Sequence, residues 1–133
     1  MEKKHLIVCV RHDIEPVFRD YFATDRKAGE LYDFFYCDHT KNIKSHFINI
    51  ARPDYHLVID AVIDSEGTMD FITEIKNEHP LLRIMLIGSA EIKKEKLVEL
   101  IRNRSLNAVL MRPFTLNDLS EKIALLYGPH HDK

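Results

Sequence analysis

Glycine is scarce in this sequence: the 133 residues include only 4, and none directly follows the first apolar run. A loop that cradles phosphates needs several glycines just after a strand, so this scarcity argues against a nucleotide-binding Rossmann domain or a P-loop enzyme. No apolar run approaches the roughly 18 residues that a membrane span requires. With a formal net charge of -2, the chain also lacks the basic excess expected of a nucleic-acid-binding domain.

Cysteine is equally scarce, and the two present, Cys9 and Cys37, lie inside apolar segments. We expect both to be reduced core residues, with a disulfide as the alternative. The apolar run Leu6–Val10 is too short for a secretory signal, which favours a cytoplasmic location. The 8 histidines show no shared short spacing of the kind found in zinc sites, so no zinc centre is predicted.

Short apolar runs alternate with longer segments of helical periodicity along the whole chain. The runs predict strands at His5–Val10, Tyr32–Cys37, Tyr55–Ile59, Leu82–Ile87 and Ala108–Met111. Helices are predicted around Pro16–Phe22 with Asp13 as the cap, and over Thr40–Ala51, Met69–Asn77, Ile92–Asn103 and Leu116–Tyr127. Residues Asp64–Thr68 are predicted to form a polar loop.

Five strands alternating with five helices predict an α/β fold in which a doubly wound parallel sheet is covered on both faces. We expect one domain over residues 1–129 and a frayed tail over residues 130–133. In such folds ligands bind at the carboxyl ends of the strands. The segments that follow the strands are therefore the ones to inspect: Arg11–Asp13, Asp60–Asp64, Gly88–Glu91 and Arg112–Phe114.

The segments around the third, fourth and fifth strands resemble those of response-regulator receiver domains, the chemotaxis-regulator-like modules of two-component systems. The resemblance is carried by Arg52–Asp54 with His56–Asp60, by Met85–Glu95 and by Leu110–Thr115, which matches the Lys-Pro-Phe motif of the family. It implies a flavodoxin-like sheet with strand order 2-1-3-4-5. It also implies a phosphorelay module that transmits a signal by protein–protein contact and is not itself an enzyme.

The resemblance assigns roles to three residues. Asp60 matches the phosphoacceptor, Ser89 matches the hydroxyl residue that contacts the phosphoryl group, and Arg112 stands where the family has a lysine. The peptide bond from Arg112 to Pro113 is expected to be cis by the same resemblance. Without the family resemblance, Asp60 is interpreted as an aspartate that ends a strand and binds loop amides. Ser89 is then equally a turn serine. A different register of the fourth strand would place Gly88 at the hydroxyl position.

The sequence departs from the family at the end of the first strand. Receiver domains have two adjacent acidic residues there, which bind magnesium together with the phosphoacceptor. Here Arg11 and His12 follow the strand, and Asp13 is the nearest acid. Magnesium requires oxygen ligands in tight octahedral geometry. We therefore expect a weak magnesium site formed by Asp13 and Asp60, while Asp64 and Glu66 are expected to be solvated loop residues.

These observations leave two functions open. In the first, Asp60 accepts a phosphoryl group from a histidine kinase or a phosphotransfer protein. In the second, the chain is a pseudo-receiver, an interaction module that uses the fold without phosphorylation. In the family, partners or a second copy bind the face formed by the fourth helix, fifth strand and fifth helix. Two sets of residues at helical spacing are expected to point inward: Leu97, Leu100 and Ile101 on the fourth helix, and Leu116, Leu119, Ile123 and Leu126 on the fifth. Val98, Leu125 and Tyr127 fall outside these sets and are expected on that face. Neither function involves nucleic acid or a membrane.

Overall fold

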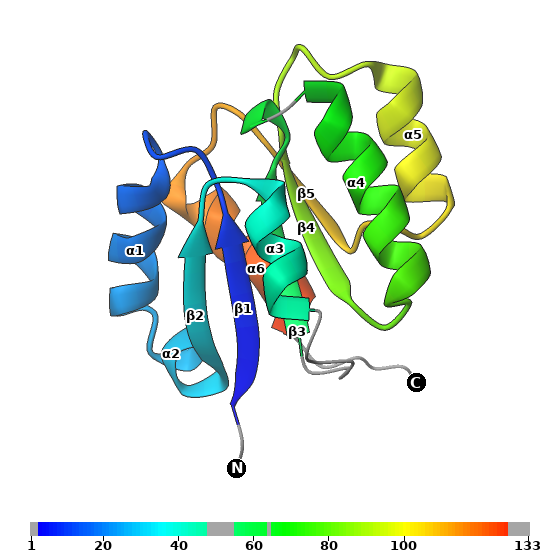
Figure 1. Ribbon diagram of the computed structural model, residues 1–133. Helices are drawn as coiled ribbons and strands as arrows, with labels where there is room; N and C mark the ends of the chain where they lie inside the picture. The colour runs from blue at the N-terminus through cyan, green and yellow to red at the C-terminus, as the bar shows by residue number, and fades with distance from the viewer. Residues whose placement is uncertain (1–2, 48–54, 64, 128–133) are drawn as a thin grey trace.

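The computed structural model describes residues 3–47, 55–63 and 65–127, apart from the side chains of residues 45–47, 65, 66 and 127. Strands and helices alternate through this part of the chain, and Figure 1 shows helices on both sides of one sheet. In chain order the elements are β1 (Lys4–Cys9), α1 (Glu15–Thr24), α2 (Arg26–Leu31), β2 (Tyr32–Cys37), α3 (Thr40–Phe47), β3 (Tyr55–Asp60), the 3-10 turn η1 (Ala61–Ile63), α4 (Ser65–Glu78), β4 (Arg83–Gly88), α5 (Lys94–Arg102), β5 (Ala108–Met111) and α6 (Leu116–Tyr127).

All strand pairs in the sheet are parallel, and the strand order is β2-β1-β3-β4-β5. The predicted order 2-1-3-4-5 and the doubly wound fold are therefore confirmed. The strand order reverses between β1 and β3, because β2 lies on one side of β1 and β3, β4 and β5 follow on the other. Ligand sites in folds of this type form at this point. The register pairs Cys9 of β1 with Cys37 of β2 on one side and with Ile59 of β3 on the other.

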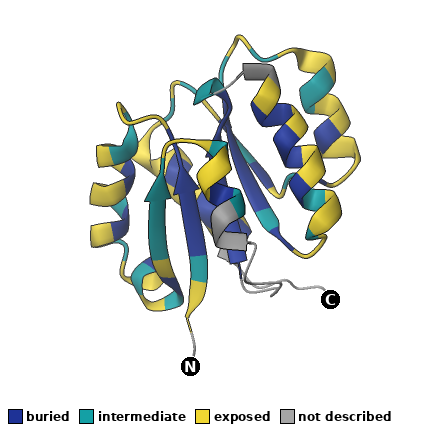
Figure 2. Ribbon diagram, viewed as in Figure 1, coloured by how far each residue is buried: buried dark blue, intermediate teal, exposed yellow. Residues whose placement is uncertain are grey.

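Each face of the sheet packs against its own set of helices, and the ribbon in Figure 2 is coloured as buried along the central strands and on the helix faces turned toward them. Helices α3, α4 and α5 cover one face, where the core includes Ile7, Leu57 and Leu86. Helices α1, α2 and α6 cover the other face, where the core includes Leu6, Val58 and Met85. The alternation of neighbouring residues between two cores explains why these strands read as continuous apolar runs. None of the helices described is long and apolar enough to cross a bilayer.

The helix prediction was wrong at three places. A sixth helix, α2, lies between α1 and β2, and its first turn is capped by Asp25, whose side chain accepts a hydrogen bond from the N–H of Ala28 at 3.1 Å. Helix α4 begins at Ser65, so Ser65–Thr68 is helical and not a loop. Asp13 does not cap α1, because Ile14 occupies the cap position and no side chain caps this helix.

Two apolar side chains lie outside the core positions predicted for them. Ile101 was expected to point inward, but it is 51% exposed on α5 while its neighbour Leu100 is buried. Leu116 begins α6 and is 58% exposed, whereas Leu119 and Ile123 on the same helix are fully buried. A residue in the first turn of a helix extends past the edge of the sheet, so helical spacing alone overstates its burial. Residues 48–51 of the second predicted helix and the tail 130–133 lie outside the described residues.

The amino end of β3 carries a buried polar pair. The hydroxyl of Tyr32 and Nδ1 of His56 share a hydrogen bond of 2.5 Å, and both residues are almost completely buried. Burial lowers the pKa of His56 to about 3, and the positive charges of Arg83 and Lys4 act in the same direction. His56 is therefore neutral in the folded protein at neutral pH.

The low pKa of His56 predicts a loss of stability in weak acid. Between about pH 6.5 and 3 the unfolded chain binds a proton at this histidine and the folded chain does not. The free energy of unfolding should then fall by about 1 kcal/mol per pH unit as the pH decreases through this range. His56→Gln should remove this slope, which urea unfolding at several pH values would measure. Tyr32→Phe should lower stability at neutral pH but keep the slope, because burial is the main cause of the pKa shift. A slope unchanged by His56→Gln would refute this interpretation.

Candidate functional site

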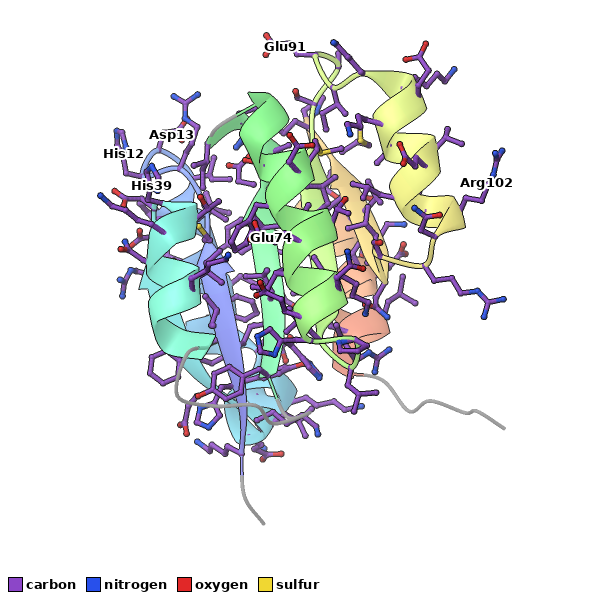
Figure 3. All side chains as sticks on the ribbon, turned by 45° about the vertical axis from the view of Figure 1, so that its right-hand side comes forward. His12, Asp13, His39, Glu74, Glu91 and Arg102 are labelled. Carbon is purple, nitrogen blue, oxygen red and sulfur yellow. The ribbon has the colours of Figure 1, made fainter. Side chains whose placement is uncertain are left out.

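Four loops meet at the carboxyl edge of the sheet, where β1, β3, β4 and β5 end. Parallel pairing places these ends on the same side, and in Figure 3 the labelled residues His12, Asp13 and Glu91 lie at this end of the molecule. Asp60 is the last residue of β3, and Gly88 is the last residue of β4. The candidate site is therefore formed by the loops after these strands, as the parallel sheet predicts.

Asp60 is held by donors from three separate segments. Its Oδ2 accepts a hydrogen bond from a terminal nitrogen of Arg112 at 2.6 Å and a second from the backbone N–H of Arg11 at 3.3 Å. Its Oδ1 accepts a hydrogen bond from the N–H of Val62, in the turn η1, at 3.1 Å. The carboxylate thus connects the loop after β1, the turn after β3 and the end of β5.

Burial of this carboxylate is complete, with an exposed side-chain fraction of 0% for Asp60 and 22% for Arg112. Burial raises the pKa of Asp60 above its usual value, while the N–H of Val62, the charge of Arg112 and the N–H of Arg11 oppose this change. A phosphoacceptor carboxylate must be accessible to its phosphoryl donor. The side chain of Asp60 is fully buried in this conformation. This enclosure is the main difference from the open strand-end carboxylate that the family resemblance implies.

Arg112 reaches Asp60 because the end of β5 is fixed against β4. Its backbone N–H donates to the carbonyl of Gly88 at 2.9 Å, which extends the strand pairing by one step. The peptide bond from Arg112 to Pro113 is cis, as expected from the resemblance. A Cβ at Gly88 would lie 2.7 Å from Sδ of Met111, whose flexible side chain is 41% exposed and can shift. The position of Arg112 therefore depends on the backbone pairing of β5 with β4.

Ser89 lies in the loop after β4 and does not bind Asp60 in this structure. Its hydroxyl accepts a hydrogen bond from the backbone N–H of Glu91 at 3.3 Å, which is the turn role that was its alternative interpretation. Ser89 also lines a cleft of about 370 Å³ with Arg11 and Val62, whose backbone N–H groups hold Asp60. The hydroxyl of Ser89 therefore lies near the site but forms its hydrogen bond within its own loop.

The same cleft has more positive than negative charge on its walls. Arg11, Lys93 and Lys96 contribute cationic side chains, and Glu91 contributes the one acid among the described lining residues. Lys96 is 3.4 Å from a carboxylate oxygen of Asp70 on α4, so part of its charge is already compensated. An anionic group is the kind of ligand that these walls would attract.

Asp13 forms an ion pair with Arg11, and its negative charge acts to raise the pKa of Asp60. Its carboxylate lies 3.3 Å from Nε of Arg11, and both side chains are about half exposed. No group of three or more His, Cys, Asp or Glu side chains in the described ranges is placed to hold a metal ion. Both oxygens of Asp60 already accept N–H donors, and a guanidinium occupies the position next to them. These residues fit Mg²⁺ poorly, and weak magnesium binding stays a prediction.

The sequence pattern placed Asp60 and Arg112 at the same edge of the sheet but did not reveal the two backbone donors. It indicated only that Arg11 stands where the family has an acid, whereas the backbone N–H of Arg11 helps to hold Asp60. Val62 was not considered at all, although an N–H two residues after an aspartate is a common partner for its side chain. Asp64 and the side chain of Glu66 lie outside the described residues.

No protein-family model matches this chain, and no curated protein matches its sequence. Solved structures do match it over nearly its whole length. The receiver domain of NtrX from Brucella abortus is 18% identical, with a TM-score of 0.68 over 94% of this chain and 99% of its own. A CheY-like response regulator receiver domain protein from Methanospirillum hungatei is 17% identical, with a TM-score of 0.70 over 92% of this chain and 91% of its own.

This chain has the receiver-domain fold. A further structure, adenylate cyclase from Rhodopirellula baltica, is 12% identical, with a TM-score of 0.71 over 96% of this chain and 89% of its own. At identities this low the similarity shows the fold alone, and one fold supports several functions. What a receiver fold does in this protein must therefore be argued from the side chains at its carboxyl edge.

The buried ion pair in this receiver fold predicts a large effect of Arg112→Met. Removing the guanidinium leaves the carboxylate of Asp60 buried without its counter-charge, which should lower the free energy of unfolding by about 3 kcal/mol at neutral pH. The loss should shrink in acid, where Asp60 of the variant becomes protonated. Urea unfolding at two pH values would measure both effects. Arg11→Met is the matched control, because its exposed pair with Asp13 contributes at most about 1 kcal/mol. Equal losses for the two variants would contradict this assignment.

Proposed function

We propose that this chain is a receiver-type signalling module that acts by protein–protein contact and does not depend on phosphorylation. The observation that carries this proposal is the enclosure of Asp60, whose carboxylate is fully buried and lies 2.6 Å from the guanidinium of Arg112. A phosphoryl donor must approach a carboxylate oxygen in line with the bond that breaks. The three donors on Asp60 occupy its oxygens instead.

The residues around Asp60 support the same proposal. Phosphoryl transfer is helped by cations that neutralise the developing charge on the transferred group. Without an adjacent acid pair, this site would depend on Arg112 and the cleft lysines for that charge. Arginine is planar and binds a carboxylate through directed hydrogen bonds, so it is a poor substitute for a flexible lysine that must move between two positions. The ion pair therefore favours one fixed state of the site.

A second function is supported by the cleft beside the site. Ser89 and the cationic walls formed by Arg11, Lys93 and Lys96 would suit a phosphoryl group attached to Asp60. In this alternative, a histidine kinase or phosphotransfer protein in the cytoplasm would donate the group, and Arg112 would move onto the phosphate. The change would require Asp60 to open toward the cleft.

Intact-mass analysis after incubation with acetyl phosphate and Mg²⁺ distinguishes the two functions. If the ion pair keeps the site closed, we expect no phosphoryl adduct, or one that forms slowly and incompletely. Asp60→Asn is the matched control, since any adduct that it retains lies on another residue. Rapid, complete modification that Asp60→Asn abolishes would overturn the phosphorylation-independent function and support the alternative.

The contact surface that we propose lies on α5, β5 and α6, which correspond to the predicted fourth helix, fifth strand and fifth helix. Five of the seven exposed large apolar side chains of the described residues belong to these elements: Val98, Ile101, Met111, Leu116 and Leu125. The side chain of Tyr127 lies outside the described residues. A surface that carries several exposed apolar side chains is typical of an interaction site. We infer that a second copy of the chain binds there.

Charged substitutions on this surface should weaken self-association without unfolding the protein. Val98→Glu and Leu125→Glu add charge to side chains that are 41% and 50% exposed, so each should change the melting temperature little. Sedimentation velocity over a range of concentrations would detect the loss of dimer. Val17→Glu is the control, because Val17 is equally exposed, at 40%, on α1, a helix outside the proposed surface. A native chain that stays monomeric throughout would refute the dimer.

A further inference from the structure

The two cysteines of the described chain form a neighbouring pair at the edge of the sheet. Cys9 ends β1 and Cys37 ends β2, and the parallel register places them directly opposite each other. Both side chains pack into the core on the face covered by α3 and α4, so they point to the same side of the sheet. Figure 1 shows β1 and β2 side by side at this position.

The distance between the two strands suits a disulfide. Neighbouring strands lie about 4.8 Å apart, and a disulfide joins Cα atoms that are about 4.4–6.8 Å apart. Both cysteines are free thiols in this structure. A bond between them would need little backbone movement, because the strand register already places the two residues opposite each other.

The two thiols differ in access and in acidity. Cys9 is fully buried, while Cys37 is partly exposed on the edge strand. The hydrogen bond from Cys9, together with the backbone N–H of His39, lowers the pKa of Cys37. The same hydrogen bond and burial raise the pKa of Cys9. An accessible thiol of lowered pKa next to a buried one is the arrangement of an attacking and a resolving cysteine.

We propose that Cys9 and Cys37 form a reversible dithiol–disulfide site that is oxidised by small disulfides such as oxidised glutathione. The thiolate of Cys37 attacks one sulphur of the oxidant, the oxidant's S–S bond breaks, and a first glutathione thiolate leaves. Cys9 then gives up its proton, its sulphur attacks that of Cys37, and a second glutathione thiolate leaves. The two cysteines are oxidised to one disulfide, and one oxidised glutathione is reduced to two glutathione molecules.

The position of this pair links it to the carboxyl edge of the sheet. The N–H of Val10, the residue after Cys9, donates to the carbonyl of Cys37 at 3.2 Å. The next residue, Arg11, donates its N–H to Asp60. A covalent bond between the strand ends therefore forms two residues away from a donor of the candidate site. The inference itself rests on the strand register and not on the proposed signalling role.

Mass spectrometry of the full chain after incubation with oxidised glutathione tests this site. The native chain should lose the mass of two hydrogen atoms, resist alkylation of both thiols after denaturation, and recover on reduction. Tryptic digestion without reductant should give one cross-linked product of His5–Arg11 and Ala28–Lys41. An amide NMR spectrum that stays dispersed would show that the oxidised chain is folded.

Two variants separate the roles of the cysteines. Cys9→Ala should leave Cys37 with one stable glutathione adduct, because the resolving thiol is missing. Cys37→Ser should remain unmodified, because Cys9 is buried. The digest of the native chain decides the question even if a variant does not fold. Two thiols that stay open to alkylation, a lasting glutathione adduct on native Cys37, or a cross-link between two chains would each overturn the proposal.

Discussion

The buried carboxylate of Asp60 is the constraint on which the arrangement of the carboxyl edge depends. A charge without solvent must be compensated by hydrogen bonds and a counter-charge, or it is strongly destabilising. Three segments supply this compensation: the loop after β1, the turn η1 and the end of β5. If η1 moves away, Oδ1 of Asp60 loses its donor, whereas Oδ2 keeps one donor unless the loop after β1 and the end of β5 both move. The hydrogen bonds to Asp60 therefore also hold the three segments together at this edge of the sheet.

The identity of the counter-charge determines how strongly these segments are held to Asp60. Arg112 contributes a planar, positively charged guanidinium that donates directed hydrogen bonds. Its planar group is fixed by the strand end behind it, where Gly88 accepts the N–H of Arg112. The site therefore has one strongly preferred arrangement. A switch requires two arrangements of similar free energy, and a ligand shifts them only by its difference in affinity for the two.

The strands were predicted well from the sequence because the apolar pattern that marks each strand lies within a few consecutive residues. Tyr32–Cys37 and Ala108–Met111 match the structure to the residue, since a strand buried on both faces is an uninterrupted apolar run. Helix α2 was missed because it is short and contains Gly29, although Asp25 offered a capping signal. The pairing of Asp60 with Arg112 followed from the parallel sheet. The burial of Asp60 did not, because it results from two backbone donors whose positions are set by the packing of separate loops.

Strand β3 shows how these requirements divide between structure and function. All six of its residues are buried, and it carries a polar side chain near each end, His56 and Asp60. Burial and nearby positive charges keep the imidazole of His56 neutral, and it shares a hydrogen bond with Tyr32. Asp60 is compensated by groups from loops, which can change their arrangement more easily than packed strands. Any regulated change in this protein is therefore expected at the carboxyl end of β3, while the amino end serves stability.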